Sequence, residues 1–529
     1  MQKKISIQLA AEDAASNDTI KKHCSSYLSI PIEKISGFHF LKKSIDARSK
    51  LIKVNLTLQV FIDEIFADRK VEKSNLLDIH NAKSNVLIVG AGPAGLFAAL
   101  QLIELGIKPI IIERGKDVRS RRRDLAKLNK EGIINPESNY CFGEGGAGTY
   151  SDGKLYTRSN KRGNIDKILN LFVEFGADER ILYESHPHIG TNKLPHIITA
   201  IRQKILDCGG EILFETKLVD FKIQNGKIKS ITTQNNDELL VEQLILATGH
   251  SGRDIYELLH SKNILIEAKP FALGVRVEHP QQIIDSIQYH CTTRNENLPP
   301  ASYSLVQQVE QRGVFSFCMC PGGIIAPAST NQRELVVNGW SPSKRNNAFA
   351  NSGMVVQIEL EDLNNIKEYK DLQLDNNSPL SMMHFQQFVE QKAYELGGGN
   401  FVAPAQRLVD FTNNKISTSL PENSYLPGLH SVELHQVLPN FIHSKLQNAF
   451  KVFGKKLKGY YTNDAIVVAT ESRTSSPVRI PRNPETLEHP QIKNLYPCAE
   501  GAGYAGGIVS AAMDGMKVAK MISEKMQAN

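Results

Sequence analysis

The sequence lacks an apolar run long enough to suggest a membrane span. Its longest apolar stretch, Val86 to Glu113, is interrupted by glycine, proline, Gln101 and Glu104, whereas a spanning helix needs about 20 mostly apolar residues. We therefore expect no transmembrane helix and no membrane partner. The first residues, MQKKISIQLAAEDA, hold an apolar stretch too short for a secretory signal. Both features favour a cytoplasmic location.

The chain also has few cysteines and a small net charge. Seven cysteines at irregular spacing in 529 residues do not make a disulfide framework, and reduced thiols are the simpler interpretation. The formal net charge of +6 is too small to favour a nucleic-acid partner without a clustered basic patch. We assign no metal ligands, and the sequence does not define an oligomeric state.

Glycine, by contrast, is concentrated where an apolar run ends. Residues 86–95 read VLIVGAGPAG, and the chain up to residue 115 predicts strand, glycine turn, helix and strand. This G-x-G-x-x-G pattern is typical of a dinucleotide-binding unit. Gly90 permits the tight turn, Gly92 lets the backbone approach a pyrophosphate, and Gly95 lets the helix pack on the strand. The N–H groups at the helix start favour phosphate there.

Glu113 ends the second apolar run of this unit. The fingerprint places at about this distance an acid that binds ribose hydroxyls. A carboxylate here fits a ribose with both hydroxyls free and repels a 2′-phosphate. The pattern therefore excludes NADPH from this site and leaves NAD and FAD.

Two further glycine-rich segments favour FAD. They are CFGEGGAGTYSDGKL at 141–155 and YPCAEGAGYAGGI at 496–508, and LILATG lies between them at 244–249. An NAD dehydrogenase needs neither segment, whereas a longer flavin dinucleotide lying across the fold needs both. With these residues the chain resembles the two-dinucleotide-binding-type flavoprotein superfamily, which has an ATG strand and a C-terminal flavin motif. In that motif Glu500 stands where the superfamily usually carries Asp.

Longer segments narrow the resemblance to a family of largely uncharacterised bacterial FAD-dependent dehydrogenases. The segments are GEGGAGTYSDGKL, FALGVRVEHPQ, RGVFSFCMCPGGIIAPAST and LYPCAEGAGYAGGIVSAAMDG. The resemblance covers nearly the whole chain, although it identifies no reaction. We recognise no motif for covalent attachment beside the three glycine motifs, so we expect FAD to be held without a covalent link.

The element pattern and the resemblance together predict an α/β fold. We expect a doubly wound FAD-binding Rossmann-type domain, an inserted strand-rich α+β substrate domain and a small N-terminal α+β domain. Asn225-Gly226 indicates a type I′ hairpin between alternating strands. The predicted boundaries are 1–80 for the N-terminal domain, 81–268 and 461–529 for the FAD-binding domain, and 269–460 for the inserted domain.

The predicted cofactor contacts follow from these motifs. Gly506 and Gly507 open a helix whose N–H groups can stabilise charge on the flavin, although they could merely pack helix on strand. Asp152 and Lys154 are expected near the flavin or its phosphates, and the alternative is that they are surface-loop charges. The full set is Gly90, Gly92, Pro93, Ala94, Gly95, Glu113, Arg114, Gly145, Gly146, Asp152, Gly153, Lys154, Leu218, Thr248, Gly249, Glu500, Gly501, Gly506, Gly507 and Ile508.

Several other residues each have two possible roles that the sequence does not decide between. Cys318 and Cys320 lie two apart in an expected strand, so both thiols project from one face; they are either two small buried hydrophobes or a thiol pair that exchanges electrons with flavin. The run RSRRRD at 119–124 either contacts a phosphate or forms a solvated helix face. His250, His435 and His443 are possible proton donors, although histidines in such positions are more often structural. We name no catalytic base.

The sequence therefore predicts an FAD-dependent oxidoreductase, a dehydrogenase that transfers a hydride between an unidentified small-molecule substrate and FAD. Only one full dinucleotide fingerprint is visible, so any NAD(P)H would bind transiently. The enzymatic alternative is an FAD monooxygenase reduced by such NAD(P)H. A third hypothesis is a flavin-bearing protein that binds or modifies RNA through the N-terminal unit.

Overall fold

The N-terminal unit is a small sheet covered by one helix. A computed structural model describes residues 1–157, 163–366, 369 and 375–528. Strands β1 (Gln2–Leu9), β3 (Lys53–Ile62) and β2 (Ile35–Asp46) pair antiparallel in that order, and α1 (Asn17–Leu28) packs on them. Ser16 caps α1 by accepting the Thr19 N–H. The sheet ends at Ile62, and an irregular segment leads to the next unit.

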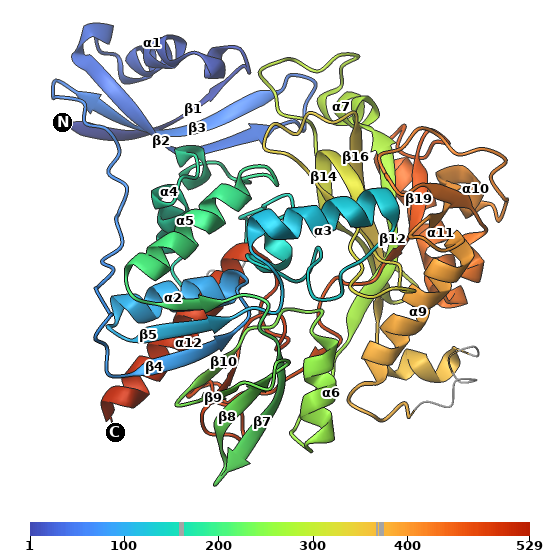
Figure 1. Ribbon diagram of the computed structural model, residues 1–529. Helices are drawn as coiled ribbons and strands as arrows, with labels where there is room; N and C mark the ends of the chain where they lie inside the picture. The colour runs from blue at the N-terminus through green and yellow to red at the C-terminus, as the bar shows by residue number, and fades with distance from the viewer. Residues whose placement is uncertain (158–162, 367–368, 370–374, 529) are drawn as a thin grey trace.

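The second unit is built on the predicted parallel sheet. Its strand order is β21 (Leu495–Pro497), β10 (Leu244–Leu246), β4 (Asn85–Val89), β5 (Lys108–Ile112) and β6 (Glu211–Leu213), and each neighbouring pair is parallel. The C-terminal strand β21 therefore pairs with β10, a strand from the first half of the chain, and Figure 1 shows β4, β5 and β10 in the same region of the molecule. This confirms the doubly wound fold.

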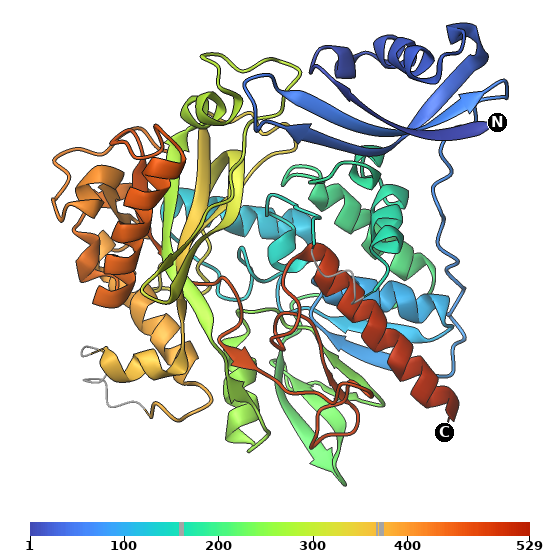
Figure 2. The same ribbon diagram turned by 180° about the vertical axis from the view of Figure 1, so that it is seen from behind.

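Two helices pack together on this sheet. Helix α2 (Pro93–Glu104) follows β4, and α12 (Ile508–Ala528) crosses it, as Figure 2 shows. A Cβ at Gly515 of α12 would lie 2.1 Å from the Ala94 carbonyl oxygen, so the two backbones meet with no side chain between them. The other helices of this unit are α3 (Val118–Glu131), α4 (Ile165–Glu174), α5 (Leu194–Asp207) and α6 (Arg253–Ser261).

An antiparallel meander leads into β10. Strands β7 (Leu218–Gln224), β8 (Lys227–Thr233) and β9 (Glu238–Leu240) pair in sequence order. Asn225 and Gly226 have φ of 53° and 69°, which is the left-handed pair that a type I′ turn requires. The predicted hairpin is confirmed.

The strand-rich unit forms a large sheet in the order β13-β14-β16-β12-β19-β17-β18, with β15 paired to β14. Helices cover it and bury nearly all of its central strand β12. Bounds in this unit are β12 (Phe271–Pro280), β13 (Val306–Val309), β14 (Arg312–Pro327), β15 (Val337–Trp340), β16 (Phe349–Ile358), β17 (Ala403–Arg407), β18 (Leu429–Ser431), β19 (Ile466–Glu471), α7 (Gln281–Tyr289), α9 (Ser381–Gly397), α10 (Leu408–Thr412) and α11 (Asn440–Lys456).

Strand β19 corrects one predicted boundary. It pairs with β12 and β17, so the strand-rich unit extends past the predicted end at residue 460. The apolar run IVVAT would suit either sheet, and only the pairing assigns it. A short pair, β11 (Glu267–Ala268) with β20 (Val478–Arg479), marks where the chain enters and leaves the unit.

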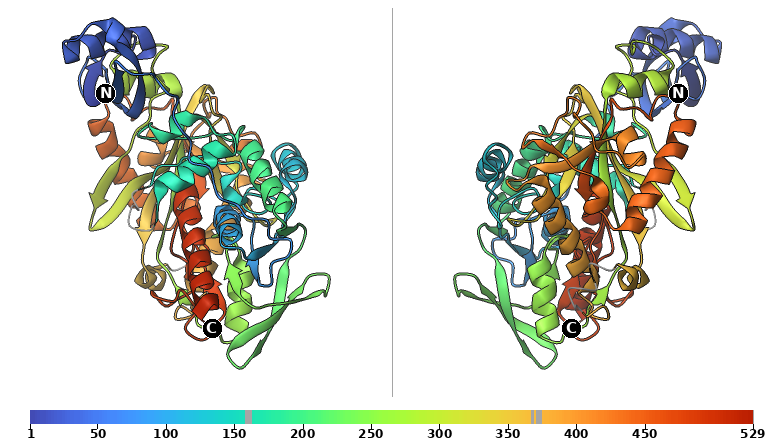
Figure 3. Two further views of the ribbon diagram at one scale, coloured as in Figure 1. Left: turned by 90° about the vertical axis from the view of Figure 1, so that its left-hand side faces the viewer. Right: turned by 90° about the vertical axis from the view of Figure 1, so that its right-hand side faces the viewer.

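The N-terminal unit contacts the second unit, where the Lys43 N–H donates to the Tyr183 carbonyl oxygen at 2.8 Å. Figure 3 shows the N-terminal unit at one end and the C-terminus toward the other. Among the described residues, no helix has the length and apolar character that a membrane crossing requires. Short 3-10 turns occur at Asp13–Ala15, Ile32–Lys34, Gly146–Gly148, Glu179–Leu182, Leu360–Asn365 and Leu434–Gln436.

The contact between α2 and α12 predicts the effect of a small substitution. Gly515→Ala should lower the free energy of unfolding of the apoprotein by about 1–3 kcal/mol, because the added methyl group overpacks a backbone contact. The control is Gly313→Ala in β14, where the nearest atom to an added Cβ is 3.7 Å away. Urea unfolding measures both, and parental stability in Gly515→Ala would contradict this close approach.

Candidate active site

A cavity of about 300 Å³ lies at the carboxyl ends of β4, β5, β10 and β21. Ligands of open α/β sheets bind at this edge. The other wall comes from the strand-rich unit, which contributes Phe317, Cys318, Asn338, Arg473 and Thr474. The cavity thus lies between the two units.

Most of the predicted cofactor residues line this cavity. The lining members are Gly90, Gly92, Pro93, Ala94, Glu113, Arg114, Gly146, Asp152, Gly153, Lys154, Leu218, Thr248, Gly249, Glu500, Gly507 and Ile508. The others, Gly95, Gly145, Gly501 and Gly506, lie outside the lining, and an added Cβ on each would come within about 3 Å of protein atoms. The structure therefore gives these four glycines a packing role.

The three fingerprint glycines have separate roles. Gly90 has φ +108°, and its Cβ would lie 2.4 Å from the Ala247 carbonyl oxygen. A Cβ on Gly95 would lie 2.0 Å from the Gly90 carbonyl oxygen. At Gly92 the nearest atom, Gly146 Cα, is 3.9 Å away. Of the three, only Gly92 has room for a Cβ, and it lines the cavity, where a ligand can approach the backbone.

Glu113 joins the loops that form the floor of the cavity. Its buried carboxylate accepts N–H hydrogen bonds from Ala91, Gly115 and Gly143, each at 2.9 Å. The sequence did not indicate these bonds, because they depend on where the loops meet. The ribose contact of Glu113 stays a prediction.

The residues present fit FAD. The Thr248 hydroxyl is buried at the cavity wall without a hydrogen-bond partner in the described structure, and no atom lies within 4 Å of a Cβ added to Gly249. Such an orphaned polar group next to open space suits a ligand that supplies the missing bond. Helix α12 begins at Ile508 on the same wall, so its first N–H groups are available to an anion or a developing negative charge.

Glu500 lines the cavity beside the start of α12. Burial raises the pKa of its carboxyl to about 7, and the nearby Lys269 opposes this rise. Its Oε1 atom would lie 3.0 Å from a Cβ on Gly506. The side chain therefore rests on that glycine, and its contact with FAD stays a prediction.

Asp152 and Lys154 are buried and half-buried members of the lining. The Asp152 carboxylate binds Lys154 Nζ at 3.2 Å and Arg345 Nη2 at 2.9 Å. Burial alone would raise the pKa of Asp152, but the two cations lower it to about 2. These residues are not solvated surface-loop charges.

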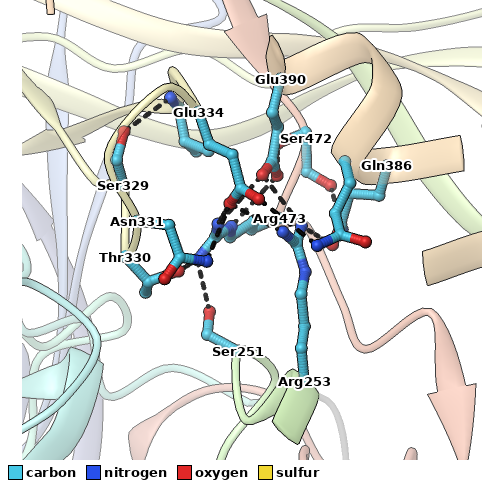
Figure 4. Close-up of polar contacts among 12 residues, drawn as sticks. Ser251, Arg253, Ser329, Thr330, Asn331, Glu334, Gln386, Glu390, Ser472 and Arg473 are labelled. Atoms are coloured by element: carbon cyan, nitrogen blue, oxygen red, sulfur yellow. Dashed lines mark hydrogen bonds and ion pairs between the residues drawn. The ribbon is translucent and has the colours of Figure 1, made fainter. Parts of the chain in front are cut away.

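A buried ion network closes one side of the cavity (Figure 4). Arg253 at the start of α6 binds Glu334 and Glu390, each at 2.9 Å, and Arg473 binds Glu390 at 3.0 Å. Arg473 also donates to Ser251 Oγ at 3.1 Å. Burial alone would raise the pKa of Glu390, but the arginines lower it to about 2. The network links the two units, and Arg473 and Ser251 line the cavity.

The remaining candidate residues, three histidines and the basic run at 119–124, divide into members at the cavity and members away from it. Of the three histidines only His250 lines the cavity; burial and Arg473 lower its pKa to about 4, so it is neutral near pH 7. His435 and His443 lie against each other elsewhere.

In the 119–124 run, Arg121 is buried and donates to the Asn139 carbonyl, whereas the other arginines of the run are exposed.

Sequence reasoning missed the wall supplied by the strand-rich unit. Asn338 and Arg473 belong to segments far from any glycine motif, and no spacing relates them to the FAD-binding unit. The described His, Cys, Asp and Glu side chains form no group of three or more suited to a metal ion.

Gly92 and Gly95 form a matched pair for mutation. Gly92→Val should leave the unfolding midpoint of the apoprotein close to the parental value while FAD affinity falls at least about a hundredfold, because the side chain enters the cavity. Gly95→Ala should instead destabilise the apoprotein, because its Cβ meets the Gly90 carbonyl. Apoproteins must be compared, since bound FAD stabilises the parent by mass action. Equal destabilisation of both variants would refute the distinction.

The raised pKa of Glu500 predicts that replacing this residue changes the unfolding free energy by an amount that depends on pH. With its pKa raised from 4.5 to about 7 in the folded chain, the unfolded state releases the proton first, so stability falls as pH rises between these values. Glu500→Gln should raise the apoprotein unfolding free energy by about 2 to 3 kcal/mol at pH 8 and leave it unchanged at pH 4. The variant should also hold FAD more weakly. The same gain at both pH values would contradict the buried carboxyl.

Three family models match the chain. Residues 270–474 match an FAD-dependent protein, C-terminal domain-like. Residues 83–129 match an FAD binding domain, and residues 1–61 match a domain of unknown function. The first match spans the strand-rich unit and includes β19.

The chain is similar to known proteins over most of its length. An uncharacterized protein of Clostridium beijerinckii is 42% identical over 523 residues, which cover 96% of this chain and 95% of that protein. A geranylgeranyl bacteriochlorophyll reductase-like protein from Thermoplasma acidophilum has 13% identity and a TM-score of 0.35, covering 84% of this chain and 80% of that chain. Glycine oxidase from Bacillus cereus has 14% identity and a TM-score of 0.32, covering 84% and 96%.

The family models, together with the fold and the cavity, identify the cofactor as FAD. Since the Clostridium beijerinckii protein is matched along almost its whole length, the chain belongs to the family of that protein, and two of the family models that match the chain are those of FAD-dependent proteins.

Proposed function

We propose that the protein is an FAD-dependent dehydrogenase that takes a hydride from a small-molecule substrate. The observation that carries this proposal is the two-walled cavity. One wall holds the cofactor residues of the parallel sheet, and the other holds Phe317, Asn338 and Thr474 from the strand-rich unit. A small molecule between these walls lies against the cofactor and away from bulk water.

FAD supplies the hydride acceptor, and reduction places negative charge on the flavin. The chain's own groups balance that charge. Gly507 and Ile508, the first residue of α12, line the cavity, and the N–H groups at this end carry the positive end of the helix dipole. The Lys154 ammonium lies in the same lining.

The second wall positions the substrate. Asn338 Oδ1 accepts a hydrogen bond from buried Arg276 at 3.1 Å, so the orientation of its amide is fixed. Arg473 is held by Glu390 and Ser251. A rigid polar wall of this kind selects a substrate by its hydrogen-bonding groups.

Anaerobic flavin bleaching tests the reaction class. The holoprotein is mixed with a panel of small metabolites without oxygen, and we expect at least one alone to bleach the flavin absorbance. The matched variant Asn338→Leu, which keeps a similar volume, should slow bleaching by that compound and leave bleaching by dithionite unchanged.

Two outcomes would replace the proposal. Bleaching by NADPH or NADH alone, followed by peroxide formation when oxygen is admitted, would identify an FAD monooxygenase with a transiently bound reductant. Salt-dependent retention of RNA without bleaching by any small molecule would favour a flavin-bearing RNA-binding protein.

A further inference from the structure

We propose that Cys318 and Cys320 form a redox-active dithiol that exchanges two electrons with FAD. The proposal goes beyond the proposed function and rests on it only in requiring FAD in the cavity. Both residues belong to β14 of the strand-rich unit. Cys318 is half-buried and lines the cavity, whereas Cys320 is fully buried behind it.

Two cations face the sulfur atoms. Lys154 Nζ lies 3.8 Å from Cys318 Sγ and 3.7 Å from Cys320 Sγ, which confirms that both thiols reach the same face. Arg276 Nη2 lies 3.9 Å from Cys320 Sγ and donates to the Cys318 carbonyl at 2.6 Å. Two cations beside the sulfur atoms favour the thiol pair over the packing interpretation of these cysteines.

The backbone departs from a regular strand at this point. Phe317 pairs with Gly353, and Cys320 pairs with Asn351, so β14 has one extra residue in a bulge. Cys318 has φ +47°, a left-handed conformation that is strained for a side chain of this kind and is concentrated at functional sites. Cys320 Sγ lies 3.3 Å from the Cys318 carbonyl oxygen. The backbone between the two thiols therefore differs from that of the regular strand, in which an i, i+2 disulfide is disfavoured.

The charges divide the pair into a thiolate and a thiol. Hydrogen bonding to Cys320 lowers the pKa of Cys318 well below its usual value, and Lys154 and Arg276 add to this effect against burial. The same hydrogen bond and burial raise the pKa of Cys320. By contrast, burial alone raises the pKa of Cys24 to about 11. Thiolates rather than thiols react, so the reactive sulfur is the one that lines the cavity.

The proposed step is balanced. A bond forms between Cys318 Sγ and Cys320 Sγ, and the S–H bond of Cys320 breaks. Two electrons and the Cys320 proton pass to oxidised FAD, which becomes the reduced, singly protonated anion. In the reverse direction the dithiol is regenerated by reduced FAD. Lys154 holds the negative charge of the thiolate and of the reduced flavin in turn.

The experiment counts electrons and thiols in the full-length holoprotein. After oxidation with diamide and desalting, anaerobic dithionite titration should consume four electrons per FAD in the parent, since each two-electron couple takes up a pair. Cys318→Ser and Cys320→Ser should consume two, and the control Cys291→Ser, which changes a half-buried cysteine outside this cavity, should consume four. Peptide mass spectrometry of the oxidised parent should find Cys318 and Cys320 linked and not alkylated.

Consumption of two electrons per FAD by the oxidised parent, with both cysteines freely alkylated, would overturn the dithiol. That result leaves the proposed function untouched, because the flavin is still reduced. The opposite result is also distinguishable. If dithionite reduces the flavin and the linked peptide is found, but no metabolite bleaches the flavin, the dithiol is supported and the dehydrogenase is not.

Discussion

The structure depends on backbone segments that meet at the carboxyl edge of the parallel sheet without side chains between them. Gly90, Gly95 and Gly515 each bring a main-chain atom within a distance that a Cβ would occupy. These contacts join β4, α2 and α12, which come from opposite ends of the chain. They leave Gly92 and the start of α12 facing the same cavity. The cofactor site therefore results from the packing of distant segments.

Buried ion pairs join the strand-rich unit to this edge of the parallel sheet. The Arg253, Arg473, Glu334 and Glu390 network pairs its charges internally. Breaking a buried ion pair is costly because it leaves an uncompensated charge. Asp152, held by Lys154 and Arg345, makes a similar link. The cavity is thus enclosed by fixed groups, as a site that orders a cofactor and a substrate requires.

The sequence predicted what local patterns encode. The glycine fingerprint, the type I′ turn at Asn225-Gly226 and the return of the C-terminal strand to the sheet follow from residue type and spacing, and the structure has all three. It could not predict that β19 joins the larger sheet, that Glu113 binds three loop N–H groups, or that Lys154 lies between two sulfurs. These contacts depend on tertiary pairing between segments far apart in the chain, which no local spacing records.

We expect the cavity to hold FAD without a covalent link. The most direct measurement is the absorption spectrum of the purified protein before and after heat denaturation, with the supernatant analysed for its flavin. The account predicts a yellow protein that releases one FAD per chain into the supernatant. A colourless protein that added FAD cannot reconstitute, or flavin that stays with the denatured chain, would contradict it.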